Sequence, residues 1–311
     1  MGLKFAATLL IALAISLGTA PPTAAMAGAT ADAGTVDASG PPSTSPAGPA
    51  STATLVGAGD IASCSVRADS KTAALVKSIP GTVFTVGDNV YPYGSAANYA
   101  QCYGPTWGAF KKRTRPVAGN HDYQHNPGAY FAYFGSRAGP SGLGYYAYDV
   151  GTWRVYALNS ELDPSSTAFT QQYDWLSNDL AANPTQCVIA MWHRPQFSTG
   201  PHGDSTRMSL FFQLLYDNGA DVVINGHDHM YERYAPIDPA GASDPTRGMR
   251  EFVVGTGGAA LYPFMTSSAL VAVRNDTSHG VLKLTLSSGS YAWQFIHSTG
   301  TFTDSGSATC H

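Results

Sequence analysis

Two histidines one residue apart, His227 and His229, follow a short apolar run at residues 221–224. The run is β-branched and bounded by polar residues, which predicts a short buried strand. In an extended or turning backbone, side chains at positions i and i+2 point the same way, so both imidazoles can face one point beyond the strand end. Imidazole is the commonest metal ligand near neutral pH. A single His-x-His sequence also occurs by chance, so its meaning depends on the rest of the chain.

Four more strand-like runs upstream end in residue types that bind metals. Their ends carry Asp60, then Asp88 with Tyr91, then Asn120, and then His193. Alone, each aspartate would more often be a helix N-cap, the asparagine a turn residue and the tyrosine an ordinary loop residue. Together with the two histidines they supply seven oxygen or nitrogen donors, which is more than one divalent ion needs. The series therefore predicts two metal ions that share a bridging carboxylate.

The residue types of this donor set indicate which reaction it could serve. A mixed set of His, Asp and Asn favours Zn, Fe, Mn or similar ions over Ca or a thiolate site. Two such ions clamp the attacking and leaving oxygens of an in-line phosphoryl displacement, and they lower the pKa of a shared water. Phosphate-monoester hydrolysis is among the slowest uncatalysed reactions, so it requires strong electrophilic help. The donor set therefore indicates a hydrolase that acts on phosphate esters.

The elements that position these donors alternate between strands and helices. Strands are predicted at residues 54–58, 82–86, 114–118, 187–191, 221–224 and 251–254, with amphipathic helices at 70–78, 169–180 and 205–216. A hairpin is expected at 145–159, and a terminal antiparallel pair at 281–286 and 291–296. This alternation indicates an α/β fold with parallel strands at its centre, where ligands collect beyond the carboxyl ends of the strands. Residues 54–311 show no internal repeat or clear boundary and are predicted to form one catalytic domain.

Composition and the N-terminal segment predict an exported globular protein. The 311 residues are 44% hydrophobic and 12% charged, and the net charge of −4 argues against a nucleic-acid partner. Residues 1–27 resemble a signal peptide, with Lys4, an apolar stretch and an A-x-A cleavage site; a membrane anchor is the alternative. Residues 28–53 are a low-complexity stretch, which predicts a disordered linker. We therefore expect a secreted, extracellular protein with no membrane segment after signal removal, and the oligomeric state stays open.

The four cysteines, Cys64, Cys102, Cys187 and Cys310, allow three disulfide connectivities. Export makes disulfides possible. Cys64 and Cys102 each follow a predicted ligand segment, so their loops are expected to lie near each other. This favours a Cys64–Cys102 bond, with Cys187–Cys310 as the second. The cysteines lack C-x-x-C spacing, which argues against a thiolate metal site.

The order of the motifs resembles that of a known family. The blocks are Gly59-Asp60, Gly87-Asp88-x-x-Tyr91, Gly119-Asn120-His121-Asp122, His193 and Gly226-His227-x-His229. They resemble the calcineurin-like metallophosphoesterases, and the position of Tyr91 is similar to that in the purple acid phosphatase branch. The resemblance covers most of residues 54–260 and implies a β-sandwich of two mixed sheets flanked by helices, in four layers. Only a low-complexity stretch precedes residue 54, so the N-terminal β-sandwich of the plant-type enzymes is not expected.

The resemblance also implies which residues hold each metal. A ferric ion would take Asp60, Asp88, Tyr91 and His229, and an Fe²⁺, Zn²⁺ or Mn²⁺ ion would take Asp88, Asn120, His193 and His227. Asp88 would bridge the two ions. Tyr91 would bind as a phenolate and give the purple colour of such enzymes.

Three further roles follow from the same resemblance. His121 would contact the phosphate, together with Asn120, and protonate the leaving group, while Asp122 would orient His121. His202 resembles the outer-sphere histidine of the family and is a second candidate for binding and protonation. The expected reaction is hydrolysis of a small phosphate monoester by in-line attack of a metal-bound hydroxide. A phosphodiesterase or nucleotidase on the same scaffold, or a catalytically silent metal-binding module, are the alternatives.

Two segments near the expected centre have structural interpretations. Glu232 and Arg233 are expected to form an ion pair that braces the histidine loop. Residues 255–258, Gly-Thr-Gly-Gly, predict close backbone packing near the metals rather than a phosphate loop, because no lysine follows them.

Overall fold

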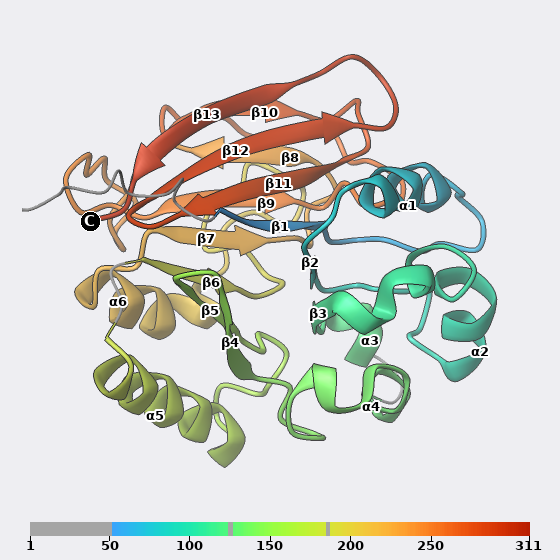
Figure 1. Cartoon of the computed structure of the whole chain (residues 1–311), viewed down its shortest axis with the longest axis horizontal. Coiled ribbons are helices and arrows are strands. Elements are labelled where there is room, and N and C mark those ends of the chain that lie inside the picture. The colour runs from blue at the N-terminus through green and yellow to red at the C-terminus, as the bar shows by residue number, and fades with distance from the viewer. Residues whose placement is uncertain (1–51, 124–126, 185–186) are drawn as a thin grey trace, which may run out of the picture. The chain divides into compact units, whose positions relative to one another are not determined.

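The computed structural model describes residues 52–123, 127–184 and 187–311 (Figure 1). The expected signal peptide, residues 1–27, and the expected linker up to residue 51 lie outside the described residues. The described residues all belong to one compact unit. None of the helices in these ranges is long and apolar enough to cross a membrane.

One sheet of the molecule contains six strands in the order β13-β12-β11-β1-β2-β3. The strands are β1 (Ala53–Ala58), β2 (Thr82–Val86), β3 (Thr114–Val117), β11 (Gly280–Ser287), β12 (Ser290–His297) and β13 (Asp304–Thr309). β1, β2 and β3 are parallel, while β11 pairs antiparallel with β1 and continues into an antiparallel ladder with β12 and β13. The sheet is therefore mixed, with its parallel half at one side.

The second sheet contains seven strands in the order β10-β8-β9-β7-β6-β5-β4. They are β4 (Tyr146–Val150), β5 (Trp153–Ala157), β6 (Val188–Met191), β7 (Val222–Asn225), β8 (Tyr231–Tyr234), β9 (Arg250–Val254) and β10 (Val271–Asn275). β5, β6, β7 and β9 are parallel, whereas β4, β8 and β10 pair antiparallel with their neighbours. The parallel strands therefore lie at the centre of the second sheet, as the sequence predicts, whereas those of the first sheet run out to the β3 edge.

The two sheets pack face to face, and helices cover the parallel strands. Leu55 and Val83 of the first sheet share a buried core with Ile189 and Phe252 of the second. A second core lies between the second sheet and the helices α5 (Thr167–Ala182) and α6 (Ser209–Asp217) (Figure 1). Strands buried on both faces read as continuous apolar runs, which explains β6 and β7. β11 and β12 instead alternate buried and more exposed residues, so their outer face meets solvent.

The helices that flank the first sheet are mostly short. They are α1 (Asp69–Ser78), α2 (Ala96–Asn98), α3 (Asn120–Tyr123) and α4 (Gly128–Phe134), with a π-helix at Tyr99–Tyr103 and 3-10 helices at Trp107–Arg113 and Gly135–Ala138. A further 3-10 helix, Thr206–Met208, leads into α6 beside the second sheet. α1 places Ala73 and Val76 in the core between the sheets and this layer. The two mixed sheets flanked by helices confirm the fold expected from the sequence.

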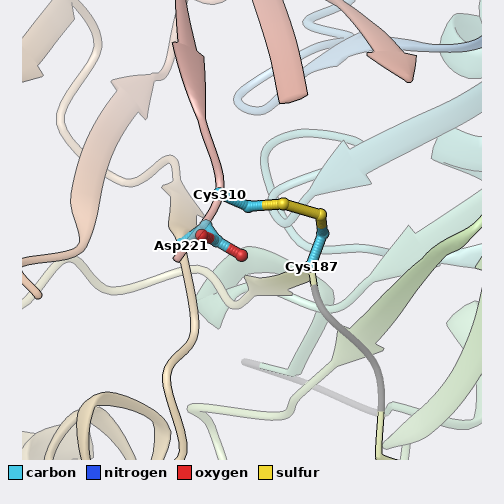
Figure 2. A group of neighbouring side chains, drawn as sticks. All are labelled: Cys187, Asp221 and Cys310. Carbon is cyan, nitrogen blue, oxygen red and sulfur yellow. A yellow bond between two sulfur atoms is a disulfide. The ribbon is translucent and has the colours of Figure 1, made fainter. Parts of the chain in front are cut away.

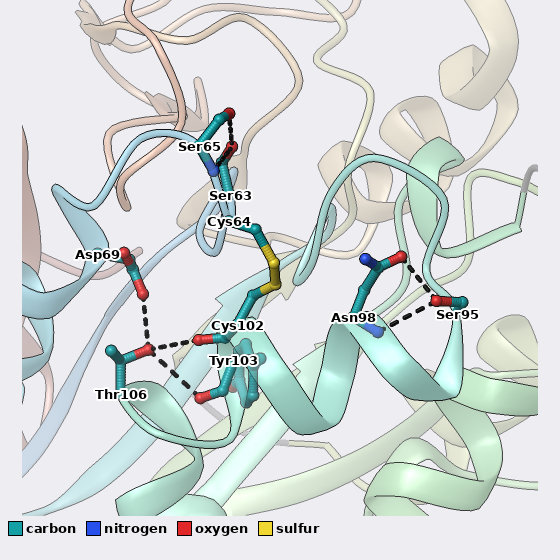
Figure 3. The surroundings of a disulfide bond; sticks show 9 residues. All are labelled: Ser63, Cys64, Ser65, Asp69, Ser95, Asn98, Cys102, Tyr103 and Thr106. Atoms are coloured by element: carbon teal, nitrogen blue, oxygen red, sulfur yellow. Dashed lines mark hydrogen bonds between the residues drawn. A yellow bond between two sulfur atoms is a disulfide. The ribbon is translucent and has the colours of Figure 1, made fainter.

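Two disulfides tie distant segments together. Cys64 and Cys102 join the loop after β1 to the π-helix, beside a 2.7 Å hydrogen bond from Thr106 to Asp69 (Figure 3). Cys187 and Cys310 join the start of β6 to the end of β13, and therefore one sheet to the other (Figure 2). Both pairings agree with the connectivity favoured from the sequence.

Candidate metal centre

The carboxyl ends of the parallel strands from both sheets meet at one edge of the sandwich. The Gly59 amide donates to Val254 O at 2.9 Å, which joins the end of β1 to the end of β9. The Gly226 amide donates to His193 O at 3.0 Å, which joins the ends of β7 and β6. The turns that follow β1, β2, β3, β6 and β7 carry the predicted ligands, so all of them lie at this edge.

Four of the predicted donors form one group around the Tyr91 hydroxyl. Its Oη lies 2.8 Å from Asp60 Oδ1, 3.1 Å from Asp88 Oδ2 and 3.0 Å from His229 Nε2. The Asp60 and His229 atoms are themselves 3.2 Å apart. These four residues are the set that the resemblance assigns to one metal.

The other donors gather around His193 Nε2. This atom lies 3.4 Å from Asp88 Oδ2 and 3.1 Å from Asn120 Oδ1. The ring of His227 lies beside it, with 4.9 Å between the two imidazole centroids. Asp88 Oδ2 is the atom common to both groups, which is the position required of a bridging carboxylate.

Backbone carbonyls fix the orientation of two of the histidine rings. His193 Nδ1 lies 2.8 Å from Val86 O, and His229 Nδ1 lies 2.7 Å from Ala260 O. A carbonyl can only accept, so Nδ1 carries the proton in both rings. Nε2 is therefore the atom that each ring presents to the donor groups, and it supplies a lone pair to a metal once it gives up its proton.

The backbone at three of the donors adopts a conformation that side-chain-bearing residues rarely take. Asp60, Asp88 and His227 have φ values of 57°, 47° and 73°. Residues held in this left-handed region cost about 1–3 kcal/mol each and cluster at functional sites. The surrounding glycines allow the close packing: a Cβ on Gly87 would overlap the His193 ring, and one on Gly119 would overlap the Asp88 carboxylate.

The charges of the donors are strongly perturbed by their burial and by one another. Burial opposes ionisation of Asp88, but His193 and His121 lower the pKa of its carboxyl well below its usual range. Burial disfavours the charged form of His193, yet Asp88 and Asp60 raise its pKa to about 10. Burial, Asp60 and Asp88 together raise the pKa of Tyr91 well above its usual 10.

The burial, charge and chemical type of the donor residues show whether they suit metal ions. Asp60 and Asp88 are essentially fully buried, and buried carboxylates need positive charge nearby. Burial and the neighbouring His193 and Arg194 lower the pKa of His227 well below its usual range, which keeps it neutral as a ligand must be. Two carboxylates, one phenol, one amide and three imidazoles fit two ions of the Fe, Zn or Mn type.

His121 lies at the open side of the donor groups. Its Nε2 is 3.9 Å from Asp88 Oδ2, its side chain is 29% exposed, and its Nδ1 lies 2.7 Å from Pro92 O. The ring is therefore oriented by a backbone carbonyl and can contact a substrate.

Asp122 differs from the sequence-based expectation that it orients His121. Its buried carboxylate accepts hydrogen bonds from the Tyr99 hydroxyl at 2.6 Å, the Gly119 amide at 2.9 Å and the Asn89 side chain at 2.9 Å. These partners tie down the loop after β3 rather than the His121 ring. We therefore assign Asp122 a structural role in shaping the turn that carries Asn120.

His202 lies beside the His227 ring of the donor set. Its ring stacks on His227 with a centroid distance of 4.0 Å, and its side chain is 42% exposed. Asp228 Oδ1 lies 2.8 Å from His202 Nδ1 and accepts from its backbone amide at 3.1 Å. The structure therefore groups His202 with the predicted ligands, as expected.

Two residues beside the centre were not singled out from the sequence. Arg194 Nη1 lies 3.2 Å from His227 Nε2, and the Tyr262 ring stacks on His229 at 3.9 Å with an interplanar angle of 9°. Arg194 had an available signal, because it directly follows a predicted ligand. Tyr262 had a weaker signal, because it lies four residues after the Gly-Thr-Gly-Gly segment that was expected to pack near the metals.

Of the two segments that were given structural interpretations, residues 255–258 pack as predicted, but Glu232 and Arg233 do not pair. Gly255 and Gly257 pack closely as predicted, since a Cβ on Gly255 would crowd Asp60 and one on Gly257 would overlap Gly59 O. The expected Glu232–Arg233 pair is wrong. Glu232 accepts hydrogen bonds from Thr199, while Arg233 pairs with Asp304 at 2.7 Å. Neighbouring residues in a strand point to opposite faces, so they reach different partners.

Comparison with known proteins agrees with the geometry. Residues 55–231 match the model of the calcineurin-like phosphoesterase family. Purple acid phosphatase 15 from Arabidopsis thaliana is 26% identical over 197 residues, covering 51% of this chain and 37% of the relative. Purple acid phosphatase 18 from the same plant is 29% identical over 185 residues, covering 52% and 41%. The chain thus spans well under half the length of these relatives.

A solved structure shows the same fold. The purple acid phosphatase PPD1 from yellow lupin seeds superposes with a TM-score of 0.61 at 20% identity, covering 84% of this chain and 54% of that one. The family match includes the first sheet's parallel strands and both histidines after β7. This chain therefore belongs to the calcineurin-like phosphoesterase family, on its purple acid phosphatase-like branch.

Proposed function

We propose that this protein hydrolyses phosphate monoesters with the help of two metal ions. The observation that carries the proposal is the division of the donors into two groups that share Asp88 Oδ2. Two ions held there would supply a water of lowered pKa and would balance the charge of the phosphoryl oxygens. Membership of a phosphoesterase family supports the same reaction class.

The residues of the chain contribute binding and proton transfer. His121 lies next to Asp88 and His202 next to His227, and their side chains are 29% and 42% exposed. Each has Nδ1 engaged by the protein, which leaves Nε2 to contact a phosphoryl oxygen. A protonated imidazole in this position binds the phosphate and donates a proton to the leaving oxygen. Asn120, whose Oδ1 lies 3.1 Å from His193 Nε2, is our candidate for a further phosphate contact.

We further propose an Fe³⁺ ion with Fe²⁺, Zn²⁺ or Mn²⁺ as its partner. The phenol of Tyr91 beside two carboxylates supports the trivalent ion, because a phenolate there adds a third negative charge. Elemental analysis of the purified protein tests this assignment. About two metals per chain including iron supports it, whereas two zinc or manganese ions would keep the hydrolase and remove the ferric ion.

Paired kinetics test the substrate class. The metal-loaded protein is assayed with p-nitrophenyl phosphate and with bis(p-nitrophenyl) phosphate, and we expect the monoester to be preferred. A diester preference would assign a phosphodiesterase instead. Replacement of Asn120 or His121 by alanine should slow turnover by about 10²–10⁴-fold, the range of general acid–base catalysis. Unchanged turnover in both variants would show that the assigned site is wrong.

We also propose that the protein acts outside the cytoplasm. The two disulfides support this, because such bonds persist mainly in oxidising compartments. The signal-like pattern in residues 1–27 supports it as well. Recovery of a chain shortened near residue 27 from the culture medium of the native host would bear this out, and retention of the full chain in the cytoplasm would contradict it.

A further inference from the structure

Arg194 follows the predicted ligand His193 and is held in one orientation by Glu161. Its Nε lies 3.0 Å from Glu161 Oε1, and its Nη2 lies 3.1 Å from Oε2. These contacts occupy one edge of the planar guanidinium. Nη1 is directed the other way, 3.2 Å from His227 Nε2. An arginine can only donate, and the one lone pair of a neutral His227 ring is used when that ring binds a metal, so in the metal-loaded protein the N–H groups of Nη1 can donate to oxygens of a bound ligand.

The segment that carries Glu161 is itself anchored on several sides. The Glu161 side chain is only 6% exposed, and the Ser160 hydroxyl donates to its Oε1 at 2.9 Å. The Glu161 amide donates to Asn159 Oδ1 at 2.9 Å, and Arg207 donates to Leu162 O at 2.8 Å. The guanidinium is therefore positioned before any substrate arrives, so binding an anion loses little side-chain entropy.

The position of this cation suits an anionic ligand. Arg194 stands beside a neutral histidine of the donor set and keeps 27% of its side chain exposed. A planar guanidinium matches the geometry of phosphate oxygens better than an ammonium does. The pair with Glu161 holds the arginine in place, while Nη1 remains directed at the centre.

We propose that Arg194 is a phosphate-binding residue that selects for the dianionic phosphoryl group of a monoester. This inference rests on the proposed function and adds a cation, supplied by the chain itself, to that site. A monoester carries one more negative charge on its peripheral oxygens than a diester. Arg194 therefore favours the monoester, and Glu161 acts through Arg194 as a positioning residue.

A purely structural pair in the same chain provides a matched control. Arg154 binds Asp179 through Nη2 at 2.7 Å and through Nε at 3.2 Å, with 17% of its side chain exposed. Arg154 lies at the start of β5, and Glu161 follows the end of that strand. The two pairs thus have similar geometry at opposite ends of the sheet.

The test compares R194Q, R194K, E161Q and R154Q in their metal-loaded forms. Binding of inorganic phosphate is measured by calorimetry, and kcat and KM are measured for p-nitrophenyl phosphate and its bis ester. Hydrogen bonds to charged groups contribute enough that R194Q should weaken phosphate binding by about ten- to hundredfold. KM for the monoester should rise by a similar factor, whereas KM for the diester should change by less than about threefold. R194K and E161Q should be intermediate, and R154Q should match the wild type in phosphate affinity.

The outcomes separate this inference from the proposed function. If R194Q keeps its metals and binds phosphate within about twofold of the wild type, Arg194 has only a structural role. If R194Q loses metal or fails to fold, E161Q is used in its place. Weaker phosphate binding by E161Q with full metal content supports the inference, and unchanged phosphate binding by E161Q overturns it. If the wild type binds phosphate but hydrolyses neither ester, the proposed function fails while the role of Arg194 is still decided by calorimetry.

Discussion

The imidazole of His202 is held by the carboxylate of Asp228, whose Oδ1 lies 2.8 Å from His202 Nδ1. Asp228 stands in the chain between the two histidines of the donor set, so one short turn both supplies ligands and orients the flanking histidine. The carboxylate also accepts from the Ser198 hydroxyl and from the His202 amide. It therefore fixes the position and the tautomer of a ring that faces the substrate.

This contact predicts the effect of Asp228→Asn. The amide cannot pair with the His202 ring as a carboxylate does, so kcat for a monoester should fall by about tenfold. Asp221→Asn is the matched control, because Asp221 is also buried but lies at the other end of β7. Equal kcat in the Asp228 variant and the wild type would contradict the assignment.

Asp88→Asn tests the bridging position. The amide keeps the shape of the side chain but removes the negative charge shared by the two donor groups. Metal content should fall from about two ions per chain to one or fewer, and turnover should fall by at least about a hundredfold. Asp304→Asn, which removes a different buried carboxylate on β13, should retain both metals. Elemental analysis of the two variants measures the metal content. Two ions bound to the Asp88 variant would show that Asp88 is not needed as a bridging ligand.

The Tyr91 phenol should titrate only when metals bind. Burial and the two neighbouring carboxylates raise its pKa well above 10, so the metal-free protein should show no Tyr91 phenolate near pH 8. Iron loading should then produce a visible absorption band in the wild type and none in Tyr91→Phe, since only the phenolate can give it. Zinc loading should leave both proteins colourless. A visible band of equal strength in the variant would exclude Tyr91 as the iron ligand.

Asp221 should make the folded state less stable as the pH rises through the acidic range. Burial raises the pKa of this carboxyl from 3.8 to about 7. Below about pH 4 both folded and unfolded states hold the proton; above it the unfolded state ionises first, so stability falls until about pH 7 and then levels off. The slope from this group is at most about 1.4 kcal/mol per pH unit.

Asp221→Asn removes that titration and should flatten the curve between pH 4 and 7. The measurement is the free energy of unfolding in urea at several pH values, with the disulfides intact. The variant loses part of the pairing to the Val188 and His311 amides, which lowers stability at all pH values but does not change the slope. An unchanged slope in the variant would assign the pH dependence to other buried acids.

The donor residues were predictable because their signal is local. Each follows a run of apolar residues that is long enough to identify as a strand, and parallel strands in one sheet end at the same edge. That rule places Asp60, Asp88 and Asn120 together, and it places His193 beside His227. The pairing of the two groups across the sheets follows from the family resemblance rather than from the runs themselves.

The features that escaped prediction depend on long-range contacts. Arg194 and Glu161 are separated by 33 residues and meet only because β5 and β6 are neighbours. The strands β8 and β13 have no clear apolar runs. β13 reads Asp-Ser-Gly-Ser-Ala-Thr, because its edge position requires few apolar residues. The resemblance assigned Asp122 to His121, but its carboxylate accepts from Gly119 in its own loop and from Tyr99 and Asn89 in two other segments.

The Cys187–Cys310 disulfide has a consequence for a centre that lies at the other end of the strands. Four of the seven donors follow strands of the first sheet and three follow strands of the second, so the geometry of the centre depends on how firmly the two sheets are held together. The bond spans a sequence separation of 123 residues, which corresponds to about 5 kcal/mol of loop-closure free energy. The bond holds the start of β6 to the end of β13, and so one sheet to the other, away from the donor residues. A reducing environment would let the two halves part more easily and would thereby couple the affinity for metal to the redox state of its surroundings.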